Sequence, residues 1–178
     1  MPGLRGRPVT TVIGLDLSLT STGLALVEDG ELTSWHCIKS TGKKTATIEQ
    51  TSERIDKIVS EVYETAHAWT GLGDFPEAVD LAVIEAPSFG SKNGSAHERG
   101  GLWWGVASML RICDAPMLKL APTSRAKFIT GNGRADKRDV LKAARQRWHM
   151  DLPNHDCADA AGLAMWGYDQ LTTTGDAA

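Results

Sequence analysis

The chain has 178 residues, of which 42% are hydrophobic and 23% are charged, as is typical of a globular protein with one domain. This composition excludes a disordered or collagen-like chain, and no apolar run approaches the roughly 20 residues that span a bilayer. The basic stretch from Met1 to Pro8 is not followed by the apolar segment of a secretory signal. We therefore expect neither a membrane protein nor a secreted one, and we place the protein in the cytoplasm.

The net charge of −3 hides an uneven distribution of charged residues along the chain. The segment from Lys119 to Arg147, called the basic segment below, has nine basic and two acidic residues. Its local balance is +7, so the remainder of the chain carries −10. Such a segment is typical of a surface that binds a polyanion such as nucleic acid, although a solvated helical face has the same composition.

Three cysteines, Cys37, Cys113 and Cys157, are far apart in the sequence and odd in number. This pattern indicates free thiols in a reducing compartment rather than a disulfide framework. Structural zinc sites use closely paired Cys or His ligands. The sequence has no such pairs, so we do not expect zinc.

The first part of the chain reads as an antiparallel meander followed by a helix. Strands are predicted at residues 10–17, 22–27 and 31–38, which are rich in β-branched and aliphatic side chains. Apolar residues then recur at helical spacing over residues 47–69. Thr47 and Gln50 are spaced as a capping box, and Gly71 ends the helix.

The second part alternates strands and helices. Strands are predicted at residues 81–84 and 117–120, and helices at residues 102–113, 136–148 and 156–171, with a short helical turn from Pro122. The order of elements predicts an α/β fold, with a sheet covered by helices on both faces. We expect one domain over residues 1–171 and a flexible tail from Thr172 to Ala178.

Four acidic residues lie where a charge is costly or where a cation would be favoured. Asp16 and Glu85 each end an apolar strand, where a carboxylate is poorly solvated and needs a partner, a proton or a metal. Asp156 and Asp159 share one face of the last helix, among small side chains, although acids near a helix start also serve as caps. If the four carboxylates converge, Mg²⁺ or Mn²⁺ would neutralise them.

Three segments carry a resemblance to a known family: residues 13–23, which include Asp16, residues 83–87, which include Glu85, and residues 156–160. They resemble the acidic motifs of RuvC-type Holliday-junction resolvases, which belong to the RNase H-like superfamily. The resemblance implies a five-stranded mixed sheet, with three antiparallel strands followed by two parallel ones, and a homodimer. It also implies that the four acids are catalytic and hold two Mg²⁺ ions, for which Mn²⁺ can substitute.

Further positions are similar to those with which the family contacts DNA. The resemblance implies DNA contacts in the basic segment, at Arg125, Lys127, Arg134, Lys137 and Arg138. Phe89 is similar to the aromatic residue that holds the junction open, but it lies one residue further from Glu85. Leu17 and Ser18 stand where bacterial members usually have Pro-Gly. These departures suit a phage-encoded relative that acts on several branched DNAs.

The predicted activity is a metal-dependent endonuclease that resolves four-way junctions, with three-way, fork or flap DNA as further substrates. Two metal ions could orient the attacking water and stabilise the leaving oxygen during phosphodiester hydrolysis. A ribonuclease of the same superfamily that acts on RNA–DNA hybrids is the main alternative. An ATP-binding protein would need a second lobe, and a relative that only binds DNA would lack one of the four acids.

Overall fold

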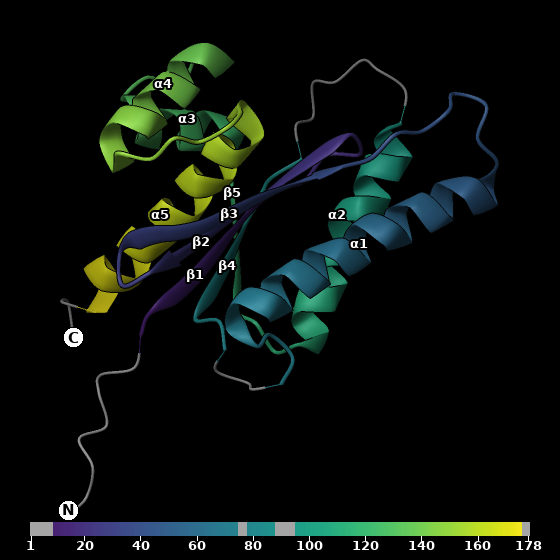
Figure 1. The fold of residues 1–178 in the computed structure, drawn as a ribbon, viewed down its shortest axis with the longest axis horizontal. Helices are drawn as coiled ribbons and strands as arrows, with labels where there is room; N and C mark the ends of the chain where they lie inside the picture. The colour runs from purple at the N-terminus through teal and green to yellow at the C-terminus, as the bar shows by residue number, and fades with distance from the viewer. Residues whose placement is uncertain (1–8, 75–77, 88–94, 176–178) are drawn as a thin grey trace, which may run out of the picture.

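The computed structural model describes residues 9–74, 78–87 and 95–175. Its centre is a five-stranded sheet with the strand order β3-β2-β1-β4-β5 (Figure 1). The strands are β1 (Thr11–Asp16), β2 (Ser21–Glu28), β3 (Glu31–Lys39), β4 (Leu81–Glu85) and β5 (Met117–Leu120). The first three strands pair antiparallel, whereas β4 runs parallel to β1 and β5 runs parallel to β4. The mixed sheet predicted from the sequence is confirmed.

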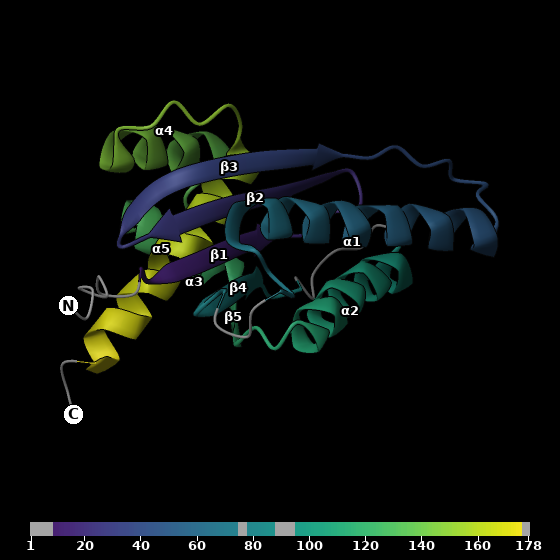
Figure 2. The same ribbon diagram turned by 60° about the horizontal axis from the view of Figure 1, so that its bottom comes forward.

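Helices cover both faces of this sheet, as predicted (Figures 1 and 2). One face is covered by α1 (Ile48–Thr70) and α2 (Ala96–Ile112). The other is covered by α5 (His155–Gly175), against which α3 (Pro122–Thr130) and α4 (Lys137–Trp148) pack. In the part of the chain that the structure describes, no helix combines the length and the apolar character needed to cross a membrane.

Each face of the sheet has its own apolar core. On the α5 side, strand residues such as Val12 and Val83 pack against small side chains of α5, among them Ala160 and Ala164. On the opposite side, large aliphatic residues of the sheet, α1 and α2 form the second core, which includes Ile13, Leu15, Ile58, Val62, Leu102 and Leu110. The sheet is therefore buried on both faces, which explains the nearly continuous apolar runs of β1 and β4.

The capping residues predicted for α1 are confirmed. The backbone N–H of Gln50 donates to the hydroxyl of Thr47 over 3.3 Å, and the side chain of Gln50 accepts from the backbone N–H of Thr47 over 3.1 Å. Gly71 follows the helix in the left-handed conformation, with φ of 73°. This is the conformation in which glycine commonly ends a helix.

Two helices are longer than the sequence predicted. The helix α2 begins at Ala96 rather than at residue 102, and its added turns contain Gly100 and Gly101. Glycine has a low helix propensity, so these turns read as a loop in the sequence. The helix α5 continues to Gly175, so residues 172–175 are helical and do not belong to an irregular tail.

Candidate active site

The position of α5 depends on two glycines in the sheet. A Cβ atom at Gly14 of β1 would lie 2.1 Å from the carbonyl oxygen of Ala160, and one at Gly23 of β2 would lie 2.2 Å from the carbonyl oxygen of Asp156. These distances are too short for any other residue, so α5 lies directly on the backbone of both strands. This close approach places the first turn of α5, with Asp156 and Asp159, at the end of β1.

Asp16 and Glu85 lie at the same edge of the sheet. The strands β1 and β4 are parallel neighbours, with Leu15 paired to Ile84, and each acid follows its strand's last paired apolar residue. The carboxyl groups of Glu85 and Asp16 are close enough to interact electrostatically. Asp159 is buried close to both, so carboxylates from β1, β4 and α5 share one region.

Burial changes the acidity of three of these carboxyl groups. Loss of solvent is the largest cause, and it raises the pKa of Asp16 to about 6, that of Asp159 to about 7 and that of Glu85 to about 8. Neighbouring carboxylates raise each pKa further: Asp156 acts on Asp16, while Asp16 acts on Glu85 and Asp159. The positive charge of Arg125 opposes the rise in all three. These raised pKa values mean that the carboxyl groups partly hold protons near neutral pH, and a cation bound to them would displace those protons.

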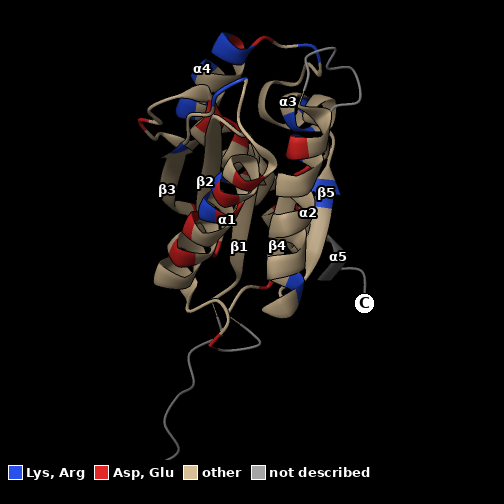
Figure 3. Ribbon diagram, turned by 90° about the vertical axis from the view of Figure 1, so that its right-hand side faces the viewer, with Lys and Arg blue, Asp and Glu red and all other residues tan. Residues whose placement is uncertain are grey.

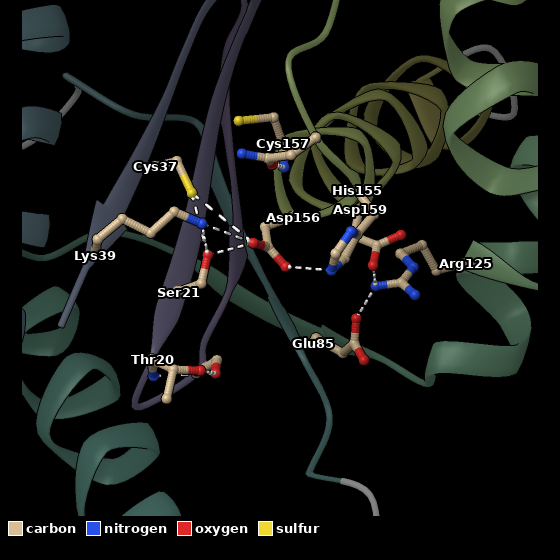
Figure 4. A network of polar contacts seen from close by, with 12 residues as sticks. Thr20, Ser21, Cys37, Lys39, Glu85, Arg125, His155, Asp156, Cys157 and Asp159 are labelled. Atoms are coloured by element: carbon tan, nitrogen blue, oxygen red, sulfur yellow. Dashed lines mark hydrogen bonds and ion pairs between the residues drawn. The ribbon is translucent and has the colours of Figure 1, made fainter. Parts of the chain in front are cut away.

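Arg125 lies inside this group of acids rather than on the surface. Its side chain comes from α3, and the Nη1 atom forms ion pairs with Glu85 and, over 3.1 Å, with Asp159 (Figure 4). The residue is only 8% exposed. The sequence predicted Arg125 as a DNA contact on an open basic face. In the structure the side chain instead points inward, because α3 packs against α5 on that side.

Asp156 forms a second set of polar contacts, directed toward β2 and β3. It accepts a hydrogen bond from the hydroxyl of Ser21 and lies 3.4 Å from the Nζ atom of Lys39 (Figure 4). The Nε2 atom of His155 lies 3.2 Å from its other carboxylate oxygen. Ser21 and Lys39 are register partners on β2 and β3, so the edge that holds Asp16 also supplies these polar groups.

Sequence reasoning missed Ser21 and Lys39 as neighbours of Asp156. The only available signal was their position at the end of the predicted hairpin nearest to Asp16, and it does not identify a partner on α5.

The backbone carbonyl of Glu85 has another neighbour that the spacing of residues in the sequence could not reveal. It accepts a hydrogen bond of 2.9 Å from the indole N–H of Trp103, which ties α2 to the end of β4.

The remaining predicted DNA contacts lie on the surface near α4. The side chains of Lys127, Arg134, Lys137 and Arg138 are exposed. The positive charge of Lys137, the first residue of α4, lowers the pKa values of Asp16 and Asp159, which places it beside the acids. Figure 3 shows Lys and Arg gathered on α3, α4 and the adjoining loops, while α1 carries many Asp and Glu residues. Phe89 lies outside the described residues.

The donor chemistry of Asp16, Glu85, Asp156 and Asp159, called the acid cluster below, fits a hard divalent cation. Carboxylate oxygens are the ligands that Mg²⁺ and Mn²⁺ prefer, and excess negative charge favours their binding. The present arrangement of side chains differs from a finished metal site. Among the described residues, no three His, Cys, Asp or Glu side chains are grouped so as to hold one ion. Between Glu85 and Asp159 the neutralising cation is Arg125.

Comparisons with known proteins agree with this arrangement of elements. The chain is 26% identical over 165 residues to the crossover junction endodeoxyribonuclease RuvC of Synechococcus sp. (strain WH7803), an alignment that covers 89% of this chain and 98% of the relative. In sequence the chain is therefore similar to a RuvC-type resolvase. No family model matches it.

Solved structures show the same fold. Thermus thermophilus RuvC superposes with a TM-score of 0.68 and 21% identity, covering 92% of this chain and 98% of that one. The fowlpox virus resolvase, in a complex with Holliday junction DNA, superposes with a TM-score of 0.55 and 13% identity, covering 91% of this chain and 99% of the viral one. The RuvC fold thus extends over nearly all of the present chain.

Proposed function

We propose that this protein is a structure-selective DNA endonuclease that resolves Holliday junctions by metal-dependent hydrolysis of phosphodiester bonds. The observation that carries the proposal is the meeting of Asp16, Glu85 and Asp159, from β1, β4 and α5, at one edge of a RuvC fold. The similarity in sequence to a crossover junction endodeoxyribonuclease supports the same activity.

The acid cluster would hold the catalytic cations, with Mg²⁺ as the physiological ion, Mn²⁺ as a substitute and two ions in each site. Bound there, such ions supply Lewis-acid activation of water and of the scissile phosphate. Asp16 is central, because it lies at the end of the middle strand and interacts with the other three acids. Ser21 and Lys39 hold the carboxylate of Asp156 in a fixed orientation.

The exposed cations near α4 would bind the substrate. Lys127, Arg134, Lys137 and Arg138 present positive charge beside the acidic edge, which suits contacts with the phosphates of a branched duplex. Lys137 is close enough to influence Asp16, so a phosphate held there lies near the acids. A homodimer would place two such sites on symmetric strands of a four-way junction.

The protein would act in a reducing cytoplasm, which suits the free thiols of Cys37, Cys113 and Cys157.

The first test is cleavage of labelled DNA by the wild-type protein and by Asp16→Asn. We expect symmetric nicks in four-way junctions with Mg²⁺ and none with a chelator. Asp16→Asn should retain junction binding and lose cleavage by a factor on the order of 10³, because several kcal/mol of metal-assisted stabilisation disappear. Asp56→Asn, a matched change of an exposed acid on α1, should cleave normally.

Substrate choice decides between this proposal and its nearest rival. Four-way, three-way, flap and RNA–DNA hybrid substrates are compared under the same conditions. Cleavage of the RNA strand of a hybrid, with the branched DNAs left intact, would contradict the proposal and indicate a ribonuclease. Normal cleavage of junctions by Asp16→Asn would show that the acid cluster is not the site of the reaction.

A further inference from the structure

Arg125 is buried in the acid cluster in a way that a DNA-binding side chain does not require. Its aliphatic part lies against α5, where a Cβ atom at Gly162 would be 3.4 Å from the Cγ atom of Arg125. The guanidinium Nη1 contacts Glu85 and Asp159, while its Nε atom is buried without a hydrogen-bond partner. A polar atom left unpaired in this way indicates that the side chain is placed for its charge rather than for complete hydrogen bonding.

The charge of Arg125 acts on the same oxygens that a metal ion would need. A guanidinium stays protonated at any physiological pH, so it provides a permanent positive charge between Glu85 and Asp159. A divalent cation bound to these two carboxylates would lie within a few ångströms of that charge. Such close repulsion in a poorly solvated region is costly, so the ion and the guanidinium compete for the same place.

The arrangement also explains how the acids stay together without a metal. The side chains of Glu85 and Asp159 are poorly solvated, and burying an unpaired charge strongly destabilises a fold. Arg125 and, from further away, Lys137 compensate part of this charge. Arg125 thus provides the protein's own substitute for a cation within the cluster.

We propose that Arg125 is an internal counter-ion that holds Glu85 and Asp159 in the metal-free protein and must release them when a divalent cation binds. The inference rests on the proposed function, since it takes the acid cluster to be the metal site. It follows that Arg125 lowers the metal affinity of the protein and raises the stability of its metal-free form. Arg125 is then a positioning residue for the cluster.

The test is calorimetric titration of Mn²⁺ into chelator-treated, DNA-free protein. Arg125→Gln removes the competing charge while keeping a hydrogen-bonding side chain, and it should bind Mn²⁺ about tenfold more tightly than the wild type. Arg125→Lys keeps the charge without the planar fork and should give a smaller gain of about threefold. Lys142→Ala, which removes one exposed positive charge on α4, should leave the affinity unchanged.

Thermal unfolding gives a second readout that does not depend on cleavage. Without metal, Arg125→Gln should melt below the wild type, and saturating Mn²⁺ should raise its melting temperature by more than it raises that of the wild type. If Arg125→Gln does not fold without metal, Arg125→Lys carries the test. Tighter Mn²⁺ binding by either variant supports the proposal.

Two negative results have different meanings. If the wild type binds Mn²⁺ and the folded Arg125 variants bind it no more tightly, the counter-ion role is wrong, while the proposed nuclease function stands. If neither the wild type nor the variants bind Mn²⁺, the metal site itself is wrong, and the inference is overturned together with it.

Discussion

The two faces of the sheet are packed with side chains of different size and charge. On the side of α1 and α2, large aliphatic residues such as Ile58 and Leu110 fill the space between helices and sheet. On the side of α5, alanines and glycines bring the helix backbone directly onto β1 and β2. The buried charged residues among those described, Arg125, Asp156 and Asp159, are all on the α5 side.

The difference shows that one side of the sheet contributes mainly apolar stabilisation, while the other side holds the charged residues of the candidate site. A core of large side chains can adjust its packing, and it stabilises the sheet whatever the state of the site. A contact between two backbones cannot adjust without moving the helix, so it fixes Asp156 and Asp159 relative to Asp16. The α5 side accordingly combines rigid placement with the cost of buried charge, and it should respond to pH and cations more than the other side does.

The largest effect is expected from pH. The carboxyl groups of Asp16, Asp159 and Glu85 hold protons in the folded metal-free protein up to pH values of about 6, 7 and 8, whereas the unfolded chain releases them near pH 4. The folded state therefore binds more protons across this range, and these groups make its stability fall as the pH rises from about 4 to about 8. Urea unfolding in a chelator measures the fall.

Glu85→Gln sharpens this test, because it removes the group that titrates last. Its stability should decline less than that of the wild type between pH 7 and pH 8. Hydrogen exchange should locate the loss of protection in α5 and β1 rather than in α1 and α2. A metal-free stability that rises steadily over this range would contradict the assignment of buried, protonated carboxyl groups to the α5 side.

The next effect is a change at the closest contact on that side. Gly14→Ala should destabilise the fold by about 1–3 kcal/mol, because its methyl group would clash with the backbone of Ala160 and Ala164. Backbone atoms, unlike a side chain, cannot relieve the clash by changing rotamer. Gly105→Ala on α2 meets only a side-chain methyl of Val59, at 3.1 Å, and should cost less. Gly100→Ala has open space and should stabilise α2 by about 0.5–1 kcal/mol.

Urea unfolding of these three variants compares the two sides directly. Equal stabilities for Gly14→Ala and Gly105→Ala would show that α5 can retreat from the sheet as easily as α1 and α2 can adjust. In that case the close contact would not be what fixes Asp156 and Asp159.

The smallest effect concerns the exposed charges of the α5 side. Lys127→Ala and Lys137→Ala should each weaken junction binding and reduce the slope of its salt dependence by about one. Lys57→Ala removes an exposed cation from α1, on the opposite side, and should change neither quantity. Gel-shift titrations over a range of salt concentrations measure the slopes. Unchanged slopes for both α5-side variants would move the DNA-binding surface elsewhere.

Much of the fold could be predicted from the sequence because its signals are local. The strands β1 and β4 are apolar runs that end in an acid, and α1 has a capping box and a terminal glycine. The start of α2 was missed, since Gly100 and Gly101 weaken the local helix signal. Gly101 lies beside Ile55 of α1, with its Cβ position 3.4 Å from the Cδ1 atom, so tertiary packing favours a small residue there.

The site could be predicted only in its acidic part. Asp16 and Glu85 end parallel neighbouring strands, a relation that follows from the order of elements. The contacts of Arg125 could not be predicted, because they depend on how α3 is turned against α5 and on which conformation a long side chain adopts. The same holds for Lys39, whose partner Asp156 comes from the other end of the chain.

The contributions of β1 and α5 to one edge of the sheet also have a consequence for biosynthesis. The ribosome makes Asp16 about 140 residues before it makes the segment with Asp156 and Asp159. A nascent or truncated chain without α5 therefore lacks two of the four acids of the acid cluster and the helix that covers one face of the sheet. The complete acid cluster would therefore form only after α5 has been synthesised and has packed onto the sheet.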